Sequence, residues 1–314
     1  MGSDPISRVG ALVTHADCLL HRMQDGHFER PERLSHLLAY LDASGIEQDM
    51  TALTPEPASI DLLSRIHPRH HVEALEQSAP TQGLVRVDPD TAMGPGSIRA
   101  AQLAAGAVVD ATRGILAGEL TWAFCAVRPP GHHAEESTAM GFCFFNSVAL
   151  GAHVALEESH LERVAILDFD VHHGNGTVDI FKDRPEVLVC SSFQHPYYPH
   201  RLFDIERPNI VNTPLDAGTD GTGFRRAIER DWLPALEAHK PQIIFVSAGF
   251  DAHRADPLGG LLLVEADFRW VTELIADAAD CYAEGRMVSS LEGGYDLDAL
   301  AHCVEAHLQA LLDH

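Results

Sequence analysis

AILDFDVHHGNGT, residues 165–177, combines a strand-like apolar run with two acids that such a strand rarely carries. Asp168 lies within the apolar run, and Asp170 lies at its end. His172 and His173 follow directly, before a Gly-Asn-Gly turn. Because an unpaired carboxylate is costly to bury, these acids predict a positively charged or hydrogen-bonding partner inside the fold.

Further apolar runs of strand length recur along the chain, with helix-like segments between them. With VAILDF (164–169), the predicted strands are WAFCAV (122–127), VLVCSS (187–192), IIFVSA (243–248) and MVSSL (287–291). Near-continuous apolar strands that alternate with helices are typical of a parallel sheet covered on both faces. We therefore expect a single-domain α/β fold over residues 1–314, with an open, mainly parallel sheet and helices on both faces. MGSDPIS (1–7) has the character of an expression remnant and carries no part of this prediction.

Three segments have the apolar periodicity of long helices. SIRAAQLAAGAVVDATRGIL (97–116) is the clearest, and Ser97 is a candidate N-cap. Residues 266–285 form a second candidate, and residues 224–239 a third that Pro234 is expected to interrupt.

Composition excludes several classes of function. The formal charge of −24 argues against nucleic-acid and anionic-membrane partners and mildly favours cationic substrates. The chain has no apolar run of membrane-spanning length, no secretory signal and no CxxC pair among its six cysteines. These features predict a reduced, cytoplasmic protein. GxxxxGK, GxGxxG and GxSxG are all missing, which argues against phosphate-binding loops and the usual serine hydrolases.

Unusual polar motifs follow each of the five predicted strands. In chain order they are RPPGHHAE, DVHHGNG, SFQHPYYPH, GFDAHRADPLGG and EGGYD. Ligands of open α/β sheets bind outside the carboxyl ends of the strands. The five motifs therefore predict one shared site at that edge.

A divalent metal ion would explain the buried acids. Asp170 and His172 project to the same side of an extended stretch, and Asp251 ends another strand. Three protein ligands with one open position are typical of catalytic zinc sites. Fe(II), Co(II) and Mn(II) remain open for an oxygen-rich set. The alternative is that the acids only cap the turns that follow them.

Two histidines and a tyrosine are candidates for the chemistry beside such a metal. His132 and His133 lie in a Pro-Gly loop, where one could act as a general base and the other could stabilise charge. Asp168 could orient one of them. Tyr295 could donate a hydrogen bond to an oxyanion. The alternatives are a pair of surface histidines and a tyrosine that only packs.

Taken together, four motifs resemble the zinc-dependent histone deacetylase superfamily, in particular its class II-like branch and the bacterial histone deacetylase-like amidohydrolases. The motifs are RPPGHHAEESTAMGFCFFN (128–146), ILDFDVHHGNGT (166–177), SAGFDAHRADPLGG (247–260) and LEGGYD (291–296). The resemblance implies an arginase-like open α/β fold. It also implies hydrolysis of an acetyl-amide, typically N-ε-acetyl-lysine in a peptide or protein, with release of acetate.

The resemblance assigns roles to the candidate residues. Zinc would be bound by Asp170, His172 and Asp251. His133 would act as the general base, and His132 would stabilise charge and assist the leaving amine.

The remaining catalytic roles follow in the same way. Tyr295 would polarise the acetyl carbonyl, and its presence implies an active enzyme. Asp168 would orient His132. Asn175 stands where class I-like members carry an aspartate, so His133 is expected to have no negative partner and a lower basicity.

Structural potassium ions are also implied. A first ion would be bound by groups of Asp168, Asp170, His172, Ser191 and Ser192. A second would be bound by the backbone carbonyls of Phe181, Arg184 and Val187.

The resemblance places further residues along a narrow substrate tunnel. Its walls and rim would be formed by Gly141, Phe142, Tyr198, Asp90 and Leu258, and Arg33 would line an internal cavity for acetate. Polyamine deacetylases of this branch carry a glutamate at the position of Leu258. A leucine there favours acyl-lysine over polyamine.

Other functions remain open at this point. Within the same class, the alternative is an acetylpolyamine or other small-molecule amidohydrolase, with a small acetylated amine as its partner. In a different class, the alternative is a catalytically silent module that binds acylated lysine. A two-manganese hydrolase of the arginase type would need more carboxylates than these motifs offer. Self-association into a homo-oligomer is left open.

Overall fold

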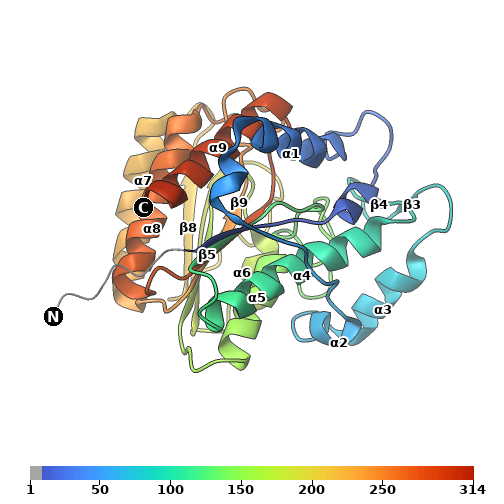
Figure 1. The fold of residues 1–314 in the computed structure, drawn as a ribbon, viewed down its shortest axis with the longest axis horizontal. Coiled ribbons are helices and arrows are strands. Elements are labelled where there is room, and N and C mark those ends of the chain that lie inside the picture. Colours follow the sequence, from blue (N-terminus) through green and yellow to red (C-terminus); the bar gives the residue numbers. More distant parts are fainter. Residues whose placement is uncertain (1–8) are drawn as a thin grey trace.

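The computed structural model describes residues 9–314, so the expected expression remnant at residues 1–7 lies outside the described residues. A sheet forms the centre of the protein, with helices around it (Figure 1). Its eight strands lie in the order β2-β1-β5-β10-β9-β6-β7-β8, and every neighbouring pair is parallel. The strands are β1 (Gly10–Val13), β2 (Thr51–Leu53), β5 (Trp122–Cys125), β6 (Val164–Asp168), β7 (Val187–Gln194), β8 (Ile210–Leu215), β9 (Ile244–Ala248) and β10 (Met287–Leu291). The mainly parallel open sheet is confirmed.

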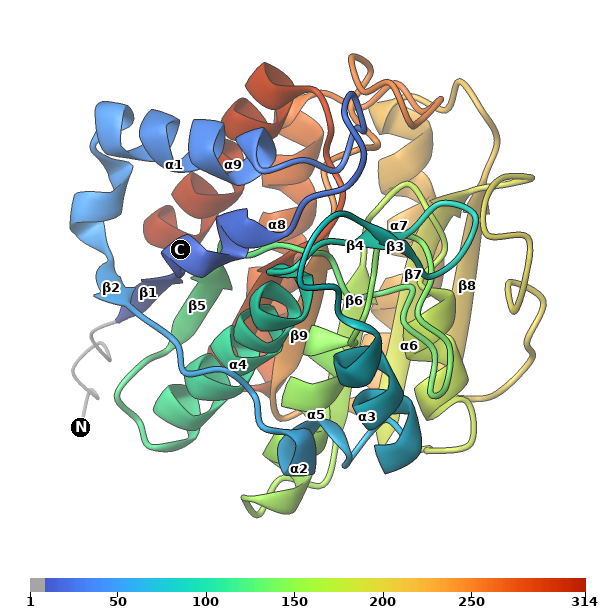
Figure 2. The same cartoon turned by 90° about the vertical axis from the view of Figure 1, so that its right-hand side faces the viewer.

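The order of the strands brings the polar motifs together. The five predicted strands are β5, β10, β9, β6 and β7, which are consecutive neighbours in the sheet. Their carboxyl ends therefore form one continuous stretch of the sheet edge. A short antiparallel hairpin, β3 (Val85–Arg86) with β4 (Ala92–Met93), adds to this region, and Figure 2 looks onto the side where it lies. Thr91 in the hairpin accepts a hydrogen bond from the backbone N–H of Phe142 at 2.9 Å.

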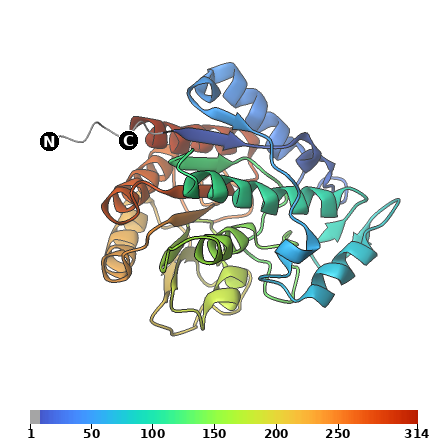
Figure 3. The same cartoon turned by 60° about the horizontal axis from the view of Figure 1, so that its bottom comes forward.

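Helices cover both faces of the sheet, as predicted (Figure 3). One face carries α1 (Glu32–Ser44), α7 (Gly221–His239), α8 (Glu265–Tyr282) and α9 (Leu297–Asp313). The other carries α4 (Ser97–Leu116), α5 (Ser147–Glu157) and α6 (Asn175–Phe181). The remaining helices are η1 (Ala16–Leu20), η2 (Ile46–Asp49), α2 (Ile60–Leu63) and α3 (Arg69–Ser78). The helices enclose strands that are apolar on both sides, which explains their unbroken hydrophobic sequences.

Two local predictions were wrong. Helix α4 has the predicted bounds, but its N-cap is Gly96, and Ser97 turns inward, where its Oγ accepts from the backbone N–H of Gly94 at 2.8 Å. Helix α7 continues through Pro234 to His239. Pro234 and Arg230 are both exposed, so water can satisfy the carbonyl that proline leaves without a helical partner.

The cysteines form no disulfide frame among the described residues, as expected from their spacing in the sequence. All six cysteines are free, and five of them are buried, whereas Cys281 is exposed. Among residues 9–314, no helix combines the length and the apolar character that crossing a membrane requires.

Candidate active site and metal centre

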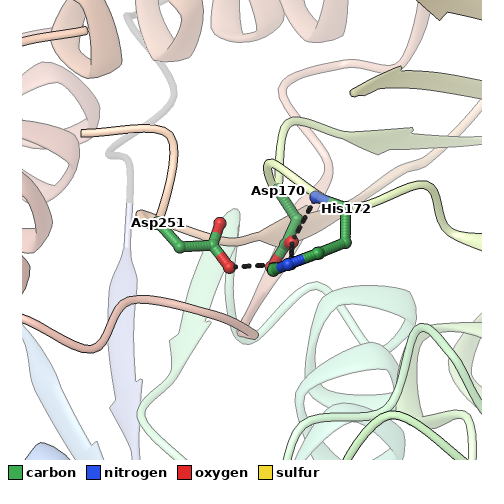
Figure 4. Close-up of side chains that lie close together, drawn as sticks. All are labelled: Asp170, His172 and Asp251. Carbon is green, nitrogen blue, oxygen red and sulfur yellow. Dashed lines mark hydrogen bonds and ion pairs between the residues drawn. The ribbon is translucent and has the colours of Figure 1, made fainter. Parts of the chain in front are cut away.

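Asp170, His172 and Asp251 meet at the carboxyl edge of the sheet. Asp170 and His172 follow β6 and Asp251 follows β9, and these two strands are neighbours. One ligand atom from each residue lies within 4.8 Å of the others. Nδ1 of His172 lies 3.0 Å from Oδ1 of Asp170 and 3.2 Å from Oδ2 of Asp251 (Figure 4). All three residues are buried.

Backbone groups hold both carboxylates in place and leave part of their coordination capacity free. Oδ2 of Asp170 accepts from the N–H of Gly293, and Oδ1 of Asp251 accepts from the N–H of Val171, each at 2.8 Å. Oδ2 of Asp251 is buried, and among the described residues its polar contact is Nδ1 of His172 at 3.2 Å, without the geometry of a hydrogen bond. A buried acceptor of this kind is costly without a partner. The two carboxylates of Asp170 and Asp251 and the imidazole of His172 form a donor set that fits a divalent ion such as zinc.

Glycine is required beside these carboxylates because the chain passes close to them. A Cβ atom on Gly293 would lie 2.0 Å from Oδ2 of Asp251 and 2.6 Å from Oδ2 of Asp170. Gly294 has a φ of +123°, a conformation that other residues rarely adopt. The Gly-Gly pair of LEGGYD therefore lets the loop after β10 close over the metal centre.

Each of the paired histidines has its own hydrogen-bond partner. Nδ1 of His132 lies 2.9 Å from Oδ2 of Asp168, and Nδ1 of His133 lies 2.7 Å from Oδ1 of Asn175. The two rings are 4.0 Å apart, between centroids. The Nδ1 contacts leave Nε2 of each ring as the atom able to exchange a proton with a substrate or water.

Their surroundings move the pKa values of the two histidines in opposite directions. Burial opposes the charged form of His132, but the nearby carboxylates of Asp170 and Asp168 raise its pKa to about 10. Burial lowers the pKa of His133 well below its ordinary value, and the charges on His132 and His172 lower it further. His132 is thus favoured as a cation and His133 as a neutral base.

Tyr295 lies on the loop after β10. Its backbone N–H donates to Oδ2 of Asp256 at 2.6 Å, and the guanidinium of Arg33 lies 4.6 Å from the centre of its ring. Burial raises the pKa of the Tyr295 phenol well above its ordinary value. The phenol therefore stays protonated and can donate a hydrogen bond.

A cavity of about 230 Å³ connects these groups. It is lined by His133, His172 and Tyr295 together with Asp90, Gly141, Phe142, Tyr197, Tyr198 and Leu258. All five residues expected along the substrate tunnel thus line one cavity with the candidate catalytic groups. A larger groove of about 460 Å³ lies between α7 and α8, and none of these residues lines it.

Comparison with known proteins identifies the family. A sequence profile of the histone deacetylase domain matches residues 27–311. The chain belongs to the histone deacetylase family.

Individual members of the histone deacetylase family match most of the chain. A histone deacetylase-like amidohydrolase of Pseudomonas aeruginosa is 39% identical over 91% of this chain and 77% of its own length. A probable deacetylase of Archaeoglobus fulgidus is 35% identical over 92% of this chain and 82% of its own length. Among solved structures, the crystal structure of the HDA15 HD domain matches with a TM-score of 0.92 and 32% identity, over 98% of this chain and 89% of that one. This structural match supports the arginase-like fold.

Arg33 is not among the residues that line the cavity of about 230 Å³, and its expected place at an internal acetate cavity stays a prediction. It is buried on α1, where its Nε donates to the carbonyl of Gly294 at 2.6 Å and Nη2 donates to that of Glu292 at 2.5 Å. Nη1 lies 3.3 Å from Oε1 of Glu29. Arg33 therefore holds the loop of Tyr295 from behind.

The two expected potassium sites differ in how well the structure supports them. For the first, Asp168 on β6 lies beside Ser191 on β7, and Oγ of Ser192 donates to the carbonyl of Asp168 at 3.5 Å. For the second, Nδ2 of Asn209 donates to the expected carbonyls at 2.8 to 3.1 Å, and these belong to Phe181, Arg184 and Val187. One NH₂ group has only two hydrogens for these three carbonyl oxygens, so the second potassium site stays a prediction.

Sequence reasoning missed two buried acids that organise the loops of the site. Oε2 of Glu292 accepts from the backbone N–H groups of Gly131 at 2.6 Å and His132 at 3.1 Å. Asp256 accepts from Tyr295 and Leu258. The signal was available for Glu292, since it directly follows an apolar strand, as Asp170 does. Tyr197 was also missed, and its ring stacks on His172 at 5.5 Å.

Proposed function

We propose that this member of the histone deacetylase family hydrolyses the acetyl-amide of N-ε-acetyl-lysine in peptides or proteins and releases acetate. The observation that carries the proposal is the cavity that His133, His172 and Tyr295 line together. A general base, a metal ligand and an oxyanion donor around one opening are the parts that metal-assisted amide hydrolysis requires. The two relatives described above, a histone deacetylase-like amidohydrolase and a probable deacetylase, support the same reaction class.

Zinc is the ion we propose for Asp170, His172 and Asp251. When bound, it would polarise the acetyl carbonyl and make a water molecule more acidic. Iron(II) and cobalt(II) suit the same donor set and are alternatives for the test. Potassium is proposed for the first site, near Asp168 and Ser191, where buried oxygen groups gather. The second site, at the carbonyls of Phe181, Arg184 and Val187, is proposed on the family resemblance alone.

The protein's own groups would divide the proton transfers. Neutral His133 would take a proton from the attacking water at Nε2, while its Nδ1 is held by Asn175. His132, kept cationic by Asp168, would stabilise the developing negative charge and assist the leaving amine. The Tyr295 phenol would donate to the carbonyl oxygen as it gains charge.

The shape of the cavity supports a lysine side chain as the substrate. Phe142 and Tyr198 offer aromatic surfaces for its aliphatic stem, and Asp90 is a rim acceptor for its backbone. Leu258 supplies no charge for a second ammonium group. The net charge of −24 favours the alternative, an acetylated polyamine, but long-range charge is screened by salt.

Two further expectations complete the proposal. Residues 1–314 would form one catalytic domain, which the profile match over residues 27–311 supports. The protein would act in the cytoplasm, and its free, mostly buried cysteines are consistent with a reducing compartment.

The test is hydrolysis of an acetyl-lysine peptide and of an N-acetylated polyamine by zinc-loaded protein, with and without a hydroxamate chelator. We expect faster turnover of the peptide and loss of turnover with the chelator. Faster turnover of the polyamine would favour the small-molecule enzyme. Binding of acylated peptides without turnover of any acyl chain would favour the silent binding module.

A further inference from the structure

The amide of Asn175 connects the candidate base His133 to a buried glutamate. Oδ1 of Asn175 faces Nδ1 of His133 at 2.7 Å, and Nδ2 donates to Oε1 of Glu135 at 2.7 Å. Nδ2 also lies 3.4 Å from the carbonyl of His133 and 3.4 Å from Sδ of Met140. Every group around Nδ2 is thus an acceptor.

The direction of this amide decides which nitrogen of His133 carries the proton. With Oδ1 toward His133, Nδ1 must be the donor, and Nε2 is left with a free lone pair. If the amide were turned over, its N–H would face Nδ1 and the proton would move to Nε2. A histidine with a proton on Nε2 cannot accept one there from water.

Glu135 is the strongest influence on that direction. An ionised carboxylate can only accept hydrogen bonds, so it pairs with the NH₂ end of the amide and not with its oxygen. The bond is charge-assisted and lies in a buried environment, where such bonds are strong. The other two neighbours of Nδ2 are uncharged and more distant.

We propose that Glu135 is a positioning residue: it fixes the amide of Asn175, which in turn keeps the lone pair of His133 on Nε2. His133 therefore has no carboxylate in direct contact with Nδ1, but the carboxylate of Glu135 is connected to it through the amide of Asn175. This inference rests on the proposed role of His133 as the base.

The surroundings of Glu135 hold it in this place. Its backbone N–H donates to the carbonyl of Thr138 at 3.0 Å, which closes a tight turn after the histidine pair. Oε2 lies 2.9 Å from Nη2 of Arg201, which is half-exposed. Burial raises the pKa of the Glu135 carboxyl, while Asn175 and Arg201 lower it and favour the ionised form.

Turnover by a set of zinc-loaded variants tests the proposal. Glu135→Ala should lower kcat roughly ten- to a hundredfold, within the range of a general base, with zinc content, KM and thermal midpoint unchanged. Glu136→Gln, an exposed neighbour, is the matched control and should stay close to the parent. Parental kcat in Glu135→Ala would overturn the proposal.

Exchanging the two groups distinguishes positioning from simple packing. Asn175→Asp alone should be slow, because it places two carboxylates side by side. The double variant Asn175→Asp with Glu135→Gln exchanges the two groups, so that a carboxylate at position 175 accepts from His133 and from the amide at position 135. It should recover most of the parental kcat. A double variant no faster than Asn175→Asp would contradict the proposed arrangement.

The tautomer can be observed without turnover. In ¹⁵N-labelled zinc-loaded protein, the chemical shifts of the His133 ring nitrogens should report N–H at Nδ1 and a lone pair at Nε2. Glu135→Ala should mix or reverse these signals, and unchanged signals would overturn the proposal. If the parent showed no hydrolysis of any substrate while the ¹⁵N signals of His133 still changed in Glu135→Ala, the proposed function would fail and the positioning role of Glu135 would stand.

Discussion

The carboxylate of Asp256 joins Tyr295 to Leu258, and both of these residues line the cavity. Oδ2 accepts from the backbone N–H of Tyr295 at 2.6 Å, and Oδ1 accepts from that of Leu258 at 2.8 Å. One buried acid thus links the loop after β9 to the loop after β10. Asp256, which is not among the residues that line the cavity, therefore helps to hold Tyr295 at the cavity.

Asp256→Ala should release the Tyr295 loop and lower kcat roughly tenfold, the effect of misplacing one oxyanion donor by a fraction of an ångström. Asp256→Asn should fall between Ala and the parent, because its amide offers one acceptor where the carboxylate offers two. Steady-state kinetics and zinc content measure both effects. Zinc loss in step with activity would show that Asp256 acts on the metal centre instead.

Tyr295→Phe removes the phenol and little else. We expect kcat to fall roughly a hundred- to a thousandfold, as for other lost oxyanion donors, with zinc content unchanged. The comparison is made with saturating acetyl-lysine peptide. Parental turnover by this variant would exclude the proposed role of the phenol.

Leu258→Glu should change the choice of substrate. A carboxylate at this half-buried position would attract the second ammonium of a polyamine. The ratio of kcat/KM for acetylpolyamine over acetyl-lysine peptide should rise roughly tenfold, less at high salt. Leu258→Gln, which has the same bulk as the glutamate without its charge, should leave the ratio near that of the parent. An equal effect of both variants would mean that shape, not charge, sets the preference.

His307 makes stability depend on pH. It is buried between Oγ1 of Thr272 at 2.7 Å and Oγ of Ser289 at 3.1 Å, and burial lowers its pKa to about 3. Below pH 6.5 the unfolded chain binds a proton that the folded chain does not, so its contribution to stability is present above pH 6.5 and is lost as the pH falls. Between pH 7.5 and pH 5, the free energy of unfolding of the parent should fall by about 2 kcal/mol more than that of His307→Gln. Urea unfolding at both pH values measures this, and equal losses would contradict it.

The sequence predicted the parts of the fold that carry strong local patterns. The five apolar strands and the bounds of α4 follow from unbroken burial and helical periodicity. Strands β1, β2 and β8 were missed: β1 has four residues and begins with glycine, β2 has three residues and is mostly exposed, and β8 is an edge strand containing Pro214. In β8, Asn212, Thr213 and Pro214 also interrupt the apolar run that identifies the predicted strands.

The sequence predicted the site residues that come soon after a strand. It did not predict the contacts between segments that are far apart in the sequence. The three candidate metal ligands, the histidine pair and Tyr295 all lie within a few residues after predicted strands, so the parallel sheet brings them together. The bond from Arg33 to Gly294 spans 261 residues, and Asn209 meets its carbonyls from a loop before β8. Such contacts depend on side-chain packing, which no short stretch of sequence encodes.

The central claim is that Asp170, His172 and Asp251 bind one divalent ion on which hydrolysis depends. The most direct measurement is the zinc stoichiometry of purified parent and Asp251→Ala proteins after dialysis against zinc, together with turnover of acetyl-lysine peptide. We predict one tightly held zinc and turnover in the parent, and loss of both in the variant. Equal zinc content and equal turnover in the two proteins would contradict the account.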